Sequence, residues 1–313
     1  MLRSFVAFLA LLLLSAPAFA EKRIAITFDD IPRDRGAFLS QDERTVKLIA
    51  ALERAGVEQA AFFVTAGFSE EPDRMGAEDR ITAYAAAGHV LANHSWSHPA
   101  LTQVSAEEYL ANLDRTEAWL KGREGRRPWF RFPYLNEGQT DHAKRDAVRA
   151  GLKARGLRNG YVTVDGADWN IEALTQQAAL AGKPMDMTAL RDFYVDTHVE
   201  AANYNRDLAR RVLGRDPIHV LLLHETDIAA LYIDDLVAAL RKDGWEIVTA
   251  DKAFDDPLKR EMPNAPSANG TLIGQIAQAR GLAESGWPEV AHGSVQRRRF
   301  YEQVLKEPLP PTP

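Results

Sequence analysis

Short apolar runs alternate along the chain with segments in which apolar residues recur at helical spacing. The apolar runs predict strands at residues 23–28, 60–64, 89–92, 129–132, 161–164, 219–223 and 246–248. The helical spacing predicts helices at residues 41–55, 79–87, 105–121, 140–155, 187–213 and 229–243. Strands that alternate with helices indicate an α/β fold with a parallel sheet, either open or closed into a barrel.

The first twenty residues have the layout of a secretory signal. Arg3 precedes an uninterrupted apolar run at 5–14, and Ala18-Phe19-Ala20 forms an A-x-A cleavage site. This run is about half as long as a transmembrane helix, which needs about 20 residues. An uncleaved N-terminal anchor is the alternative interpretation. We expect an exported chain, periplasmic or secreted, with no stable membrane insertion after the signal is removed.

Composition and charge restrict the chemistry that this chain can perform. It has no Cys among its 313 residues, which excludes disulfides, Cys-ligated metals and a thiol nucleophile. A metal ion would therefore be held by His, Asp or Glu. The net charge of −6 argues against a general nucleic-acid-binding protein. Neither a G-x-G-x-x-G motif after the first strand nor a P-loop is present, so we expect no nucleotide cofactor.

Five polar motifs lie at or just after predicted strands, where α/β proteins build their active sites. They are TFDD at 27–30, HSWSH at 94–98, RFPY at 131–134, DGADW at 165–169 and LLLH at 221–224. Taken singly, TFDD is also compatible with an acidic turn and RFPY with a surface arginine. DGADW is compatible with an ordinary loop, and LLLH with a buried histidine. We assign the other histidines to the hydrophobic core, namely His89, His142, His198, His219 and His292.

The spacing of two histidines favours metal binding. His94 and His98 would lie about 6 Å apart along one face of a helix, where both imidazoles can reach one ion. Asp30 would complete a set of two imidazoles and one carboxylate, with open positions for water and substrate. Such a set suits zinc or a similar divalent ion.

Taken in order, the five motifs resemble the signature of the polysaccharide deacetylase superfamily, the NodB-homology or family-4 carbohydrate esterases. The resemblance runs from Ile24 to about Asp256. It implies a deformed (β/α)7-type barrel that removes acyl groups from carbohydrates with the help of a metal. We accordingly expect a signal at 1–20, a catalytic domain at 21–256 and a partly helical C-terminal extension at 257–313.

The resemblance also implies roles for individual residues. It assigns the proton-transfer chemistry to Asp29, Arg131, Asp168 and His224. Of these, Asp29 would be the base that Arg131 tethers, and His224 would be the acid that Asp168 orients. The implied metal ligands are Asp30, His94 and His98. The expected ion is Zn²⁺, with Co²⁺ and Ni²⁺ as alternatives.

Substrate contacts follow from the same resemblance. The backbone N–H of Tyr134 would help to bind the oxyanion, and Trp169 and Leu222 would line the acetyl pocket. One position departs from the family, which usually has Gly after the two aspartates. Here Ile31 occupies it, and Ile does not readily adopt positive φ.

The predicted activity is that of a hydrolase acting on carbon–nitrogen bonds other than peptide bonds, a linear amide deacetylase. Its partner would be an acetylated amino-sugar glycan, such as a chitin-like oligosaccharide, peptidoglycan or poly-GlcNAc. An O-acetyl esterase acting on xylan or another acetylated polysaccharide would use the same residues. A glycan-binding homologue without activity is the alternative from a different class.

Overall fold

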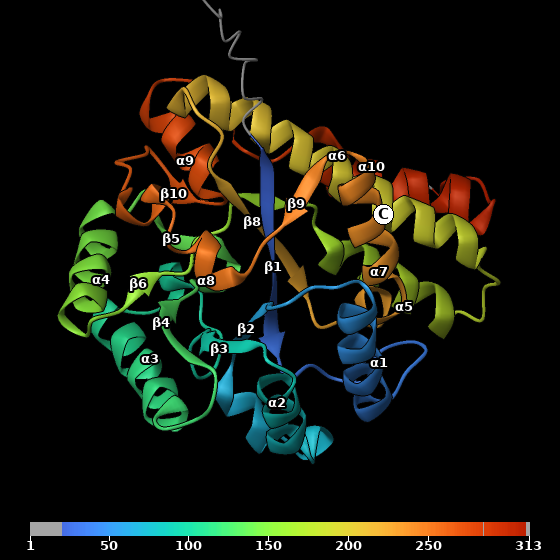
Figure 1. The fold of residues 1–313 in the computed structure, drawn as a ribbon, viewed down its shortest axis with the longest axis horizontal. Coiled ribbons are helices and arrows are strands. Elements are labelled where there is room, and N and C mark those ends of the chain that lie inside the picture. The colour runs from blue at the N-terminus through green and yellow to red at the C-terminus, as the bar shows by residue number, and fades with distance from the viewer. Residues whose placement is uncertain (1–20, 284, 311–313) are drawn as a thin grey trace, which may run out of the picture.

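The computed structural model describes residues 21–283 and 285–310 (Figure 1). The predicted signal segment, residues 1–20, lies outside the described residues. Within the described ranges, no helix combines the length and the apolar character that a membrane span requires.

A curled parallel sheet forms the centre of the molecule (Figure 1). In the described part of the chain its strand order is β6-β4-β3-β2-β1-β8-β7, and β9 also pairs with β1. These strands are β1 (Lys22–Ile31), β2 (Ala61–Val64), β3 (Val90–Asn93), β4 (Arg126–Phe130), β6 (Arg158–Asn159), β7 (Val164–Asp165), β8 (Ile218–His224) and β9 (Trp245–Ile247). A separate antiparallel pair joins β5 (Asn136–Gln139) to β10 (Ala268–Asn269). The curled sheet confirms the predicted deformed (β/α)7-type barrel.

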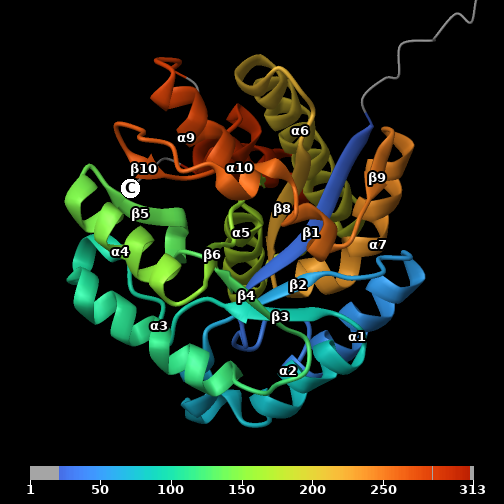
Figure 2. The ribbon, with the colours of Figure 1, turned by 60° about the vertical axis from the view of Figure 1, so that its left-hand side comes forward.

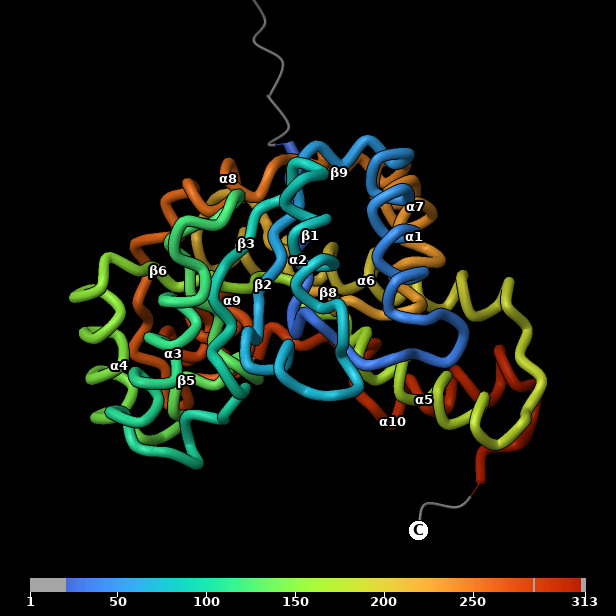
Figure 3. Tube along the Cα trace, turned by 90° about the horizontal axis from the view of Figure 1, so that it is seen from below, coloured from blue at the N-terminus to red at the C-terminus, as the bar shows by residue number. Residues whose placement is uncertain are grey.

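Helices surround this sheet on its outside, as Figure 2 shows for α1 to α4. Their bounds are α1 (Gln41–Arg54), α2 (Ala77–Ala86), α3 (Ala106–Leu120), α4 (His142–Ala154), α5 (Asp168–Leu180), α6 (Met187–Leu213), α7 (Asp227–Lys242), α8 (Ala250–Ala253), α9 (Leu272–Ala279) and α10 (Gly293–Arg299). A π-helical turn at Phe300–Leu305 continues α10. In Figure 3 this C-terminal segment lies beside α5, which it also contacts.

The core lies on both faces of the central strands. Residues 219–223 of β8 are all buried, as expected of a strand covered on both sides. Residues beyond 256 join this core, because Leu272, Ile273 and Ile276 of α9 pack in one cluster with Val220 and Trp129. The described residues beyond 256, at 257–283 and 285–310, therefore pack on the barrel, and β10 ties them to β5.

The predicted elements agree with the structure where the local signals are strong. The helix predicted at 187–213 is α6, which begins after the N-cap Asp186 and ends at Gly214 with a φ of 71°. The strand predicted at 161–164 is shorter, as only Val164 and Asp165 form β7. Helix α5 was not predicted.

The histidines assigned to the core are of two kinds. His89, His198 and His219 are buried, as predicted. The prediction is wrong for His142 and His292, which are exposed. Both begin a helix: His142 is the first residue of α4, and His292 is the N-cap of α10.

Candidate active site and metal centre

The register of the parallel strands brings the predicted motifs to one edge of the sheet. Asp29, near the end of β1, lies opposite His224, the last residue of β8. Asn93, which ends β3, lies opposite Phe130, which ends β4. His94 and the residue after Phe130 therefore leave the sheet at the same level. Side chains from distant parts of the sequence thereby line one cleft of about 450 Å³.

Three metal-ligating side chains converge at this edge. One oxygen of Asp30, Oδ1, lies 3.2 Å from Nε2 of His94 and 3.0 Å from Nε2 of His98. The two Nε2 atoms are 3.2 Å apart. Within the described ranges this is the one group of three or more His, Asp or Glu residues close enough to hold an ion. Asp30, His94 and His98 therefore form a candidate metal site.

The hydrogen bonding of His94 and the charge of Asp30 fit a divalent cation. Nδ1 of His94 lies 2.9 Å from the carbonyl oxygen of Arg131, to which it donates, and Nε2 therefore faces Asp30. Burial alone would raise the pKa of Asp30, but hydrogen bonds with His94 and His98 hold it well below its usual value. Asp30 is therefore an anionic ligand, and the donor set suits zinc or a similar ion.

The backbone at the metal site is strained, and this strain brings the ligands together. Asp30, Ser95 and His98 have φ values of 63°, 73° and 56°, which non-glycine residues seldom adopt. The predicted helix for the two histidines is therefore wrong: positive φ at Ser95 turns the chain, and 94–98 is a loop. Positive φ near the end of β1 falls on Asp30, so Ile31 stays in the strand beside Val64 and no Gly is needed at its position.

Hydrogen bonds hold the histidine loop in this conformation. The Ser95 N–H donates to the side chain of Asn93 over 2.7 Å, and the His98 N–H donates to Oγ of Ser95 over 3.0 Å. The Trp96 N–H donates to Asn112 of α3 over 2.7 Å. The loop is thus fixed locally and from the neighbouring helix, which offsets its backbone strain.

A buried ion pair holds the first aspartate. Nη1 of Arg131 lies 2.7 Å from Oδ1 of Asp29, and both side chains are almost inaccessible to solvent. The guanidinium also donates to the carbonyl oxygens of Gly160 and Tyr161, and it lies 4.0 Å from the centre of the Phe63 ring. Because Oδ1 is engaged, Oδ2 is the carboxylate oxygen left to accept a proton.

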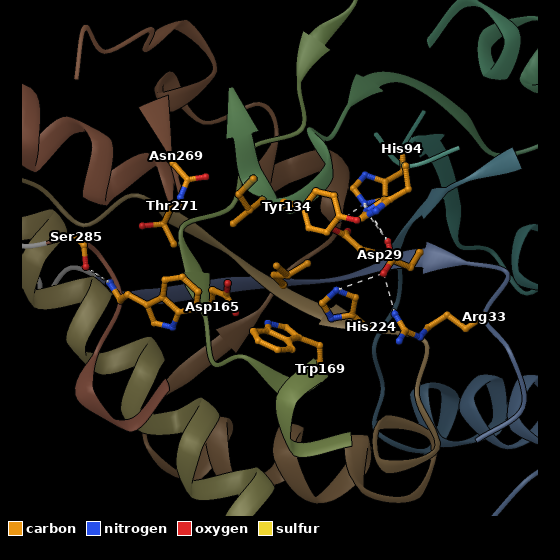
Figure 4. Close-up of a pocket in the computed structure, with 16 residues that line it drawn as sticks. Asp29, Arg33, His94, Tyr134, Asp165, Trp169, His224, Asn269, Thr271 and Ser285 are labelled. Carbon is orange, nitrogen blue, oxygen red and sulfur yellow. Dashed lines mark hydrogen bonds and ion pairs between the residues drawn. The ribbon is translucent and has the colours of Figure 1, made fainter. Parts of the chain in front are cut away.

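A second ion pair holds the histidine on β8. Nδ1 of His224 lies 2.7 Å from Oδ1 of Asp168, and Oδ2 of Asp168 accepts the His224 backbone N–H over 2.7 Å. Burial lowers the pKa of His224, but the charge of Asp168, its hydrogen bond and the charge of Asp30 outweigh this effect and raise it to about 9. His224 is therefore protonated at neutral pH. Figure 4 shows it in the cleft with Asp29 and His94.

Comparison with known proteins finds a similar sequence family and a similar fold. The sequence model of the family described as polysaccharide deacetylase matches residues 16–155. Over this segment, which is less than half of its length, the chain is similar to the polysaccharide deacetylase family. The chitin deacetylase from the fungal pathogen Colletotrichum lindemuthianum has a similar fold, with a TM-score of 0.51 at 19% identity over 76% of this chain and 89% of that chain.

Two relatives with described activities match shorter segments of this chain. The peptidoglycan-N-acetylglucosamine deacetylase of Bacillus cereus is 32% identical over 117 residues, which are 37% of this chain and 38% of that protein. Chitin deacetylase 1 of Cryptococcus neoformans is 32% identical over 146 residues, which are 43% of this chain and 28% of that protein. The chain thus spans less than two fifths of the length of each relative.

The three expected substrate-contacting residues also line the cleft. Tyr134 has a φ of 58°, and its exposed ring lies edge-on to His98 with ring centres 4.4 Å apart. Trp169 is 43% exposed at the start of α5, whereas Leu222 is buried. Arg131 and Asp168 do not line the cleft, because they lie behind the side chains that they hold.

Sequence reasoning missed several residues that line this cleft. Arg33 lies 2.8 Å from Oδ2 of Asp30, and only its position three residues after the aspartates could have indicated this. Asp165 lies within a predicted motif but received no role of its own. The other missed residues are Leu135, Asn269, Gly270, Thr271, Ser285 and Trp287. Most of them come from the segment beyond 256, which carries none of the five motifs.

Proposed function

We propose that this chain is a metal-dependent hydrolase that removes N-acetyl groups from an acetylated amino-sugar glycan. Candidate glycans are chitin-like oligosaccharides, peptidoglycan and poly-GlcNAc. One observation carries the proposal: an arginine-tethered carboxylate, a His₂-carboxylate set and a histidine paired with Asp168 meet in one cleft. The names of the relatives agree with it, because they describe deacetylases of peptidoglycan and chitin.

The metal ligands in this proposal are Asp30, His94 and His98. Zn²⁺ is the expected ion, and Co²⁺ and Ni²⁺ are the alternatives. A bound ion of this kind supplies Lewis-acid polarisation of the acetyl carbonyl and acidifies a water molecule in the site. The hydrogen bond between Nδ1 of His94 and the Arg131 carbonyl keeps Nε2 directed at the ion position.

The proton transfers belong to Asp29 and His224. Asp29 takes a proton from the attacking water through Oδ2, while Arg131 holds and orients the carboxylate. The oxygen of that water bonds to the acetyl carbon. His224 then donates its Nε2 proton to the sugar nitrogen, because an amide nitrogen cannot depart unprotonated. The C–N bond breaks, and acetate and a free amine leave.

Two further groups stabilise the reacting acetamide. The Tyr134 backbone N–H is assigned to the developing oxyanion, and one such donor contributes roughly 3 kcal/mol to transition-state stabilisation. Trp169 and Leu222 are assigned to the acetyl pocket, where apolar side chains suit a methyl group. A protonated His224 favours an amide substrate over an ester, since an alkoxide leaving group needs the acid less.

The proposal extends to the organisation and location of the chain. We assign residues 1–20 to a cleaved export signal, 21–256 to the catalytic region and 257–313 to an extension packed on it. The enzyme would act in the periplasm or outside the cell. An acetylated cell-wall or extracellular glycan would meet it there.

Acetate release tests the proposed function. Purified protein is incubated with N-acetylglucosamine oligosaccharides and, separately, with acetylated xylan, each with and without a chelator. We expect acetate from the oligosaccharides, loss of release with chelator and recovery when Zn²⁺ is added back. Release from xylan alone would identify an O-acetyl esterase instead. Oligosaccharide binding by metal-loaded protein without any release would identify a glycan-binding homologue.

A further inference from the structure

The cleft continues beyond the residues that would perform the reaction. Asn269, Thr271 and Ser285 lie in Figure 4 at the end opposite His94 and Arg33. Gly270 and Trp287 line the same cleft. These five residues form the far end of the cleft, and none of them is Asp, Glu, Lys or Arg. The reaction end, in contrast, carries Asp29, Asp30 and Arg33.

Trp287 differs from most tryptophans of this protein. The chain has six, and four of them contact another aromatic ring or a cation: Trp96, Trp119, Trp129 and Trp245. Within the described residues, no such contact involves the rings of Trp169 and Trp287. These two are 43% and 37% exposed, and both line the cleft. The two unpaired indoles therefore lie in the cleft.

The segment that carries Trp287 is held tightly against α9. A Cβ added to Gly274 would overlap the carbonyl oxygen of Ser285, and one added to Gly286 would overlap Oγ1 of Thr271. The two backbones thus approach as closely as only glycine allows. Thr271 is itself fixed, because its Oγ1 accepts the Gly274 N–H over 3.1 Å.

Backbone hydrogen bonds tie the same region to the catalytic motifs. The Gly270 N–H donates to the carbonyl oxygen of Leu135 over 3.0 Å, next to Tyr134. The Leu272 N–H donates to the carbonyl oxygen of Val162 over 2.7 Å, just before β7. The far end of the cleft is therefore held in a fixed position relative to the reaction end.

We propose that Trp287 forms a sugar-binding subsite for a neutral pyranose ring adjacent to the one that is deacetylated. A pyranose presents an apolar C–H face that packs on an aromatic ring, while its hydroxyls bond to polar neighbours such as the Asn269 amide. Trp169 and Trp287 would then contact different sugars of one chain. This inference rests on the proposed function and adds that the enzyme recognises at least two linked sugars.

Chain-length dependence tests the subsite. Acetate release is measured with the N-acetylglucosamine monomer and tetramer for wild-type protein and for Trp287→Ala. We expect the variant to raise KM for the tetramer about tenfold, with kcat little changed and the monomer unaffected. Trp287→Tyr should restore most of the tetramer KM, because it keeps an aromatic face. Equal effects on monomer and tetramer, or no effect on either, would overturn the subsite.

Two controls separate the subsite from a general loss of structure. Leu282→Ala alters a residue of the same extension that is 39% exposed and does not line the cleft, so its kinetics should match wild type. Gly274→Ala should push the Ser285 segment away from α9 and reproduce the selective loss for the tetramer. A tetramer KM unchanged by Gly274→Ala would contradict the role of this packing.

A binding measurement distinguishes failure of the subsite from failure of the proposed function. The tetramer is titrated into Asp29→Asn protein by calorimetry, with and without Trp287→Ala. About tenfold weaker binding in the double variant supports the subsite even if the wild-type protein releases no acetate. Acetate release by wild type with equal binding by both variants would refute the subsite and leave the deacetylase function intact.

Discussion

The two ends of the cleft are lined by different kinds of side chain. The reaction end consists of acidic and imidazole side chains at the ends of β1, β3 and β8. Partner side chains hold them, as Arg131 holds Asp29 and Asp168 holds His224. The far end consists of neutral side chains from the C-terminal segment, among which the ring of Trp287 has no aromatic or cationic partner in the described residues.

This difference reflects two physical requirements. Charged groups buried in a cleft must be paired and hydrogen-bonded, or burial would shift their pKa values and neutralise them. A surface that binds sugar must instead leave its apolar faces and polar groups unpaired until the ligand arrives. Substitutions at the reaction end should therefore affect metal binding, kcat and pH dependence, and those at the far end should affect KM.

Loss of a metal ligand should have the largest effect. His98→Ala removes one of three ligands, so we expect loss of bound Zn²⁺ and a fall in kcat of at least about 10²–10⁴-fold. Metal content by elemental analysis and acetate release check this. His142→Ala, which alters an exposed histidine on α4, should retain both. Full activity of a metal-free His98→Ala protein would show that the reaction end needs no metal.

Removing the partner of the acid should change the pH profile. Asp168→Asn removes the charge that raises the pKa of His224, so that pKa falls from about 9. Less His224 is then protonated at pH 8, and the alkaline limb of kcat should move to lower pH, with kcat there about 10²-fold lower. A kcat profile over pH 5–10 measures this. An unmoved alkaline limb would mean that His224 is not the acid.

Asp165 lies in the cleft and should affect stability rather than chemistry. Burial raises its pKa to about 6, against the hydrogen bond from the Ala167 N–H. A raised folded-state pKa gives stability that is full below the unfolded value near 3.9 and is lost as pH rises through about 6. Asp165→Asn should thus add about 2–3 kcal/mol to the free energy of unfolding at pH 7.5 and little near pH 4.

Urea unfolding of wild-type protein and Asp165→Asn at the two pH values measures this difference. The variant keeps an oxygen that can accept the Ala167 N–H, so the loop should be preserved. A variant less stable than wild type at pH 7.5 would show that Asp165 has a stabilising partner. Arg131 and His224, which interact with it through charge, are the cations to test.

Removal of the Tyr134 hydroxyl should have the smallest effect on kcat and KM. The proposed oxyanion donor is the backbone N–H, and the side chain is 64% exposed. Tyr134→Phe keeps the ring that lies against His98, so kcat and KM should stay within about twofold of wild type. A tenfold loss of kcat would assign the hydroxyl a part in the reaction.

The sequence predicted the reaction end because its residues follow strands. In a parallel sheet the register carries such residues to one edge, as it does for Asp29 and His224. The loop geometry was not predictable from propensity, since Ser95 and His98 adopt positive φ without being glycine.

The residues that line the far end were not predicted from the sequence, for a different reason. Trp287 reaches the cleft through the close approach of Gly274 to Ser285, a tertiary contact that leaves no periodic signal in the sequence. Helix α5 was missed because its buried positions include the polar Glu172 and Thr175, which weaken the apolar pattern. Local patterns thus predicted residues that meet at the reaction end, and tertiary packing determines the rest of the cleft.

The most direct test compares the two adjacent aspartates in one experiment. Asp29→Asn and Asp30→Asn proteins are prepared with Zn²⁺ and measured for metal content and for acetate release from the N-acetylglucosamine tetramer. We predict that both variants are inactive, that Asp29→Asn retains zinc and that Asp30→Asn loses it. Loss of zinc from Asp29→Asn with retention in Asp30→Asn would reverse the two roles, and acetate release by either variant at the wild-type rate would contradict the proposed reaction end.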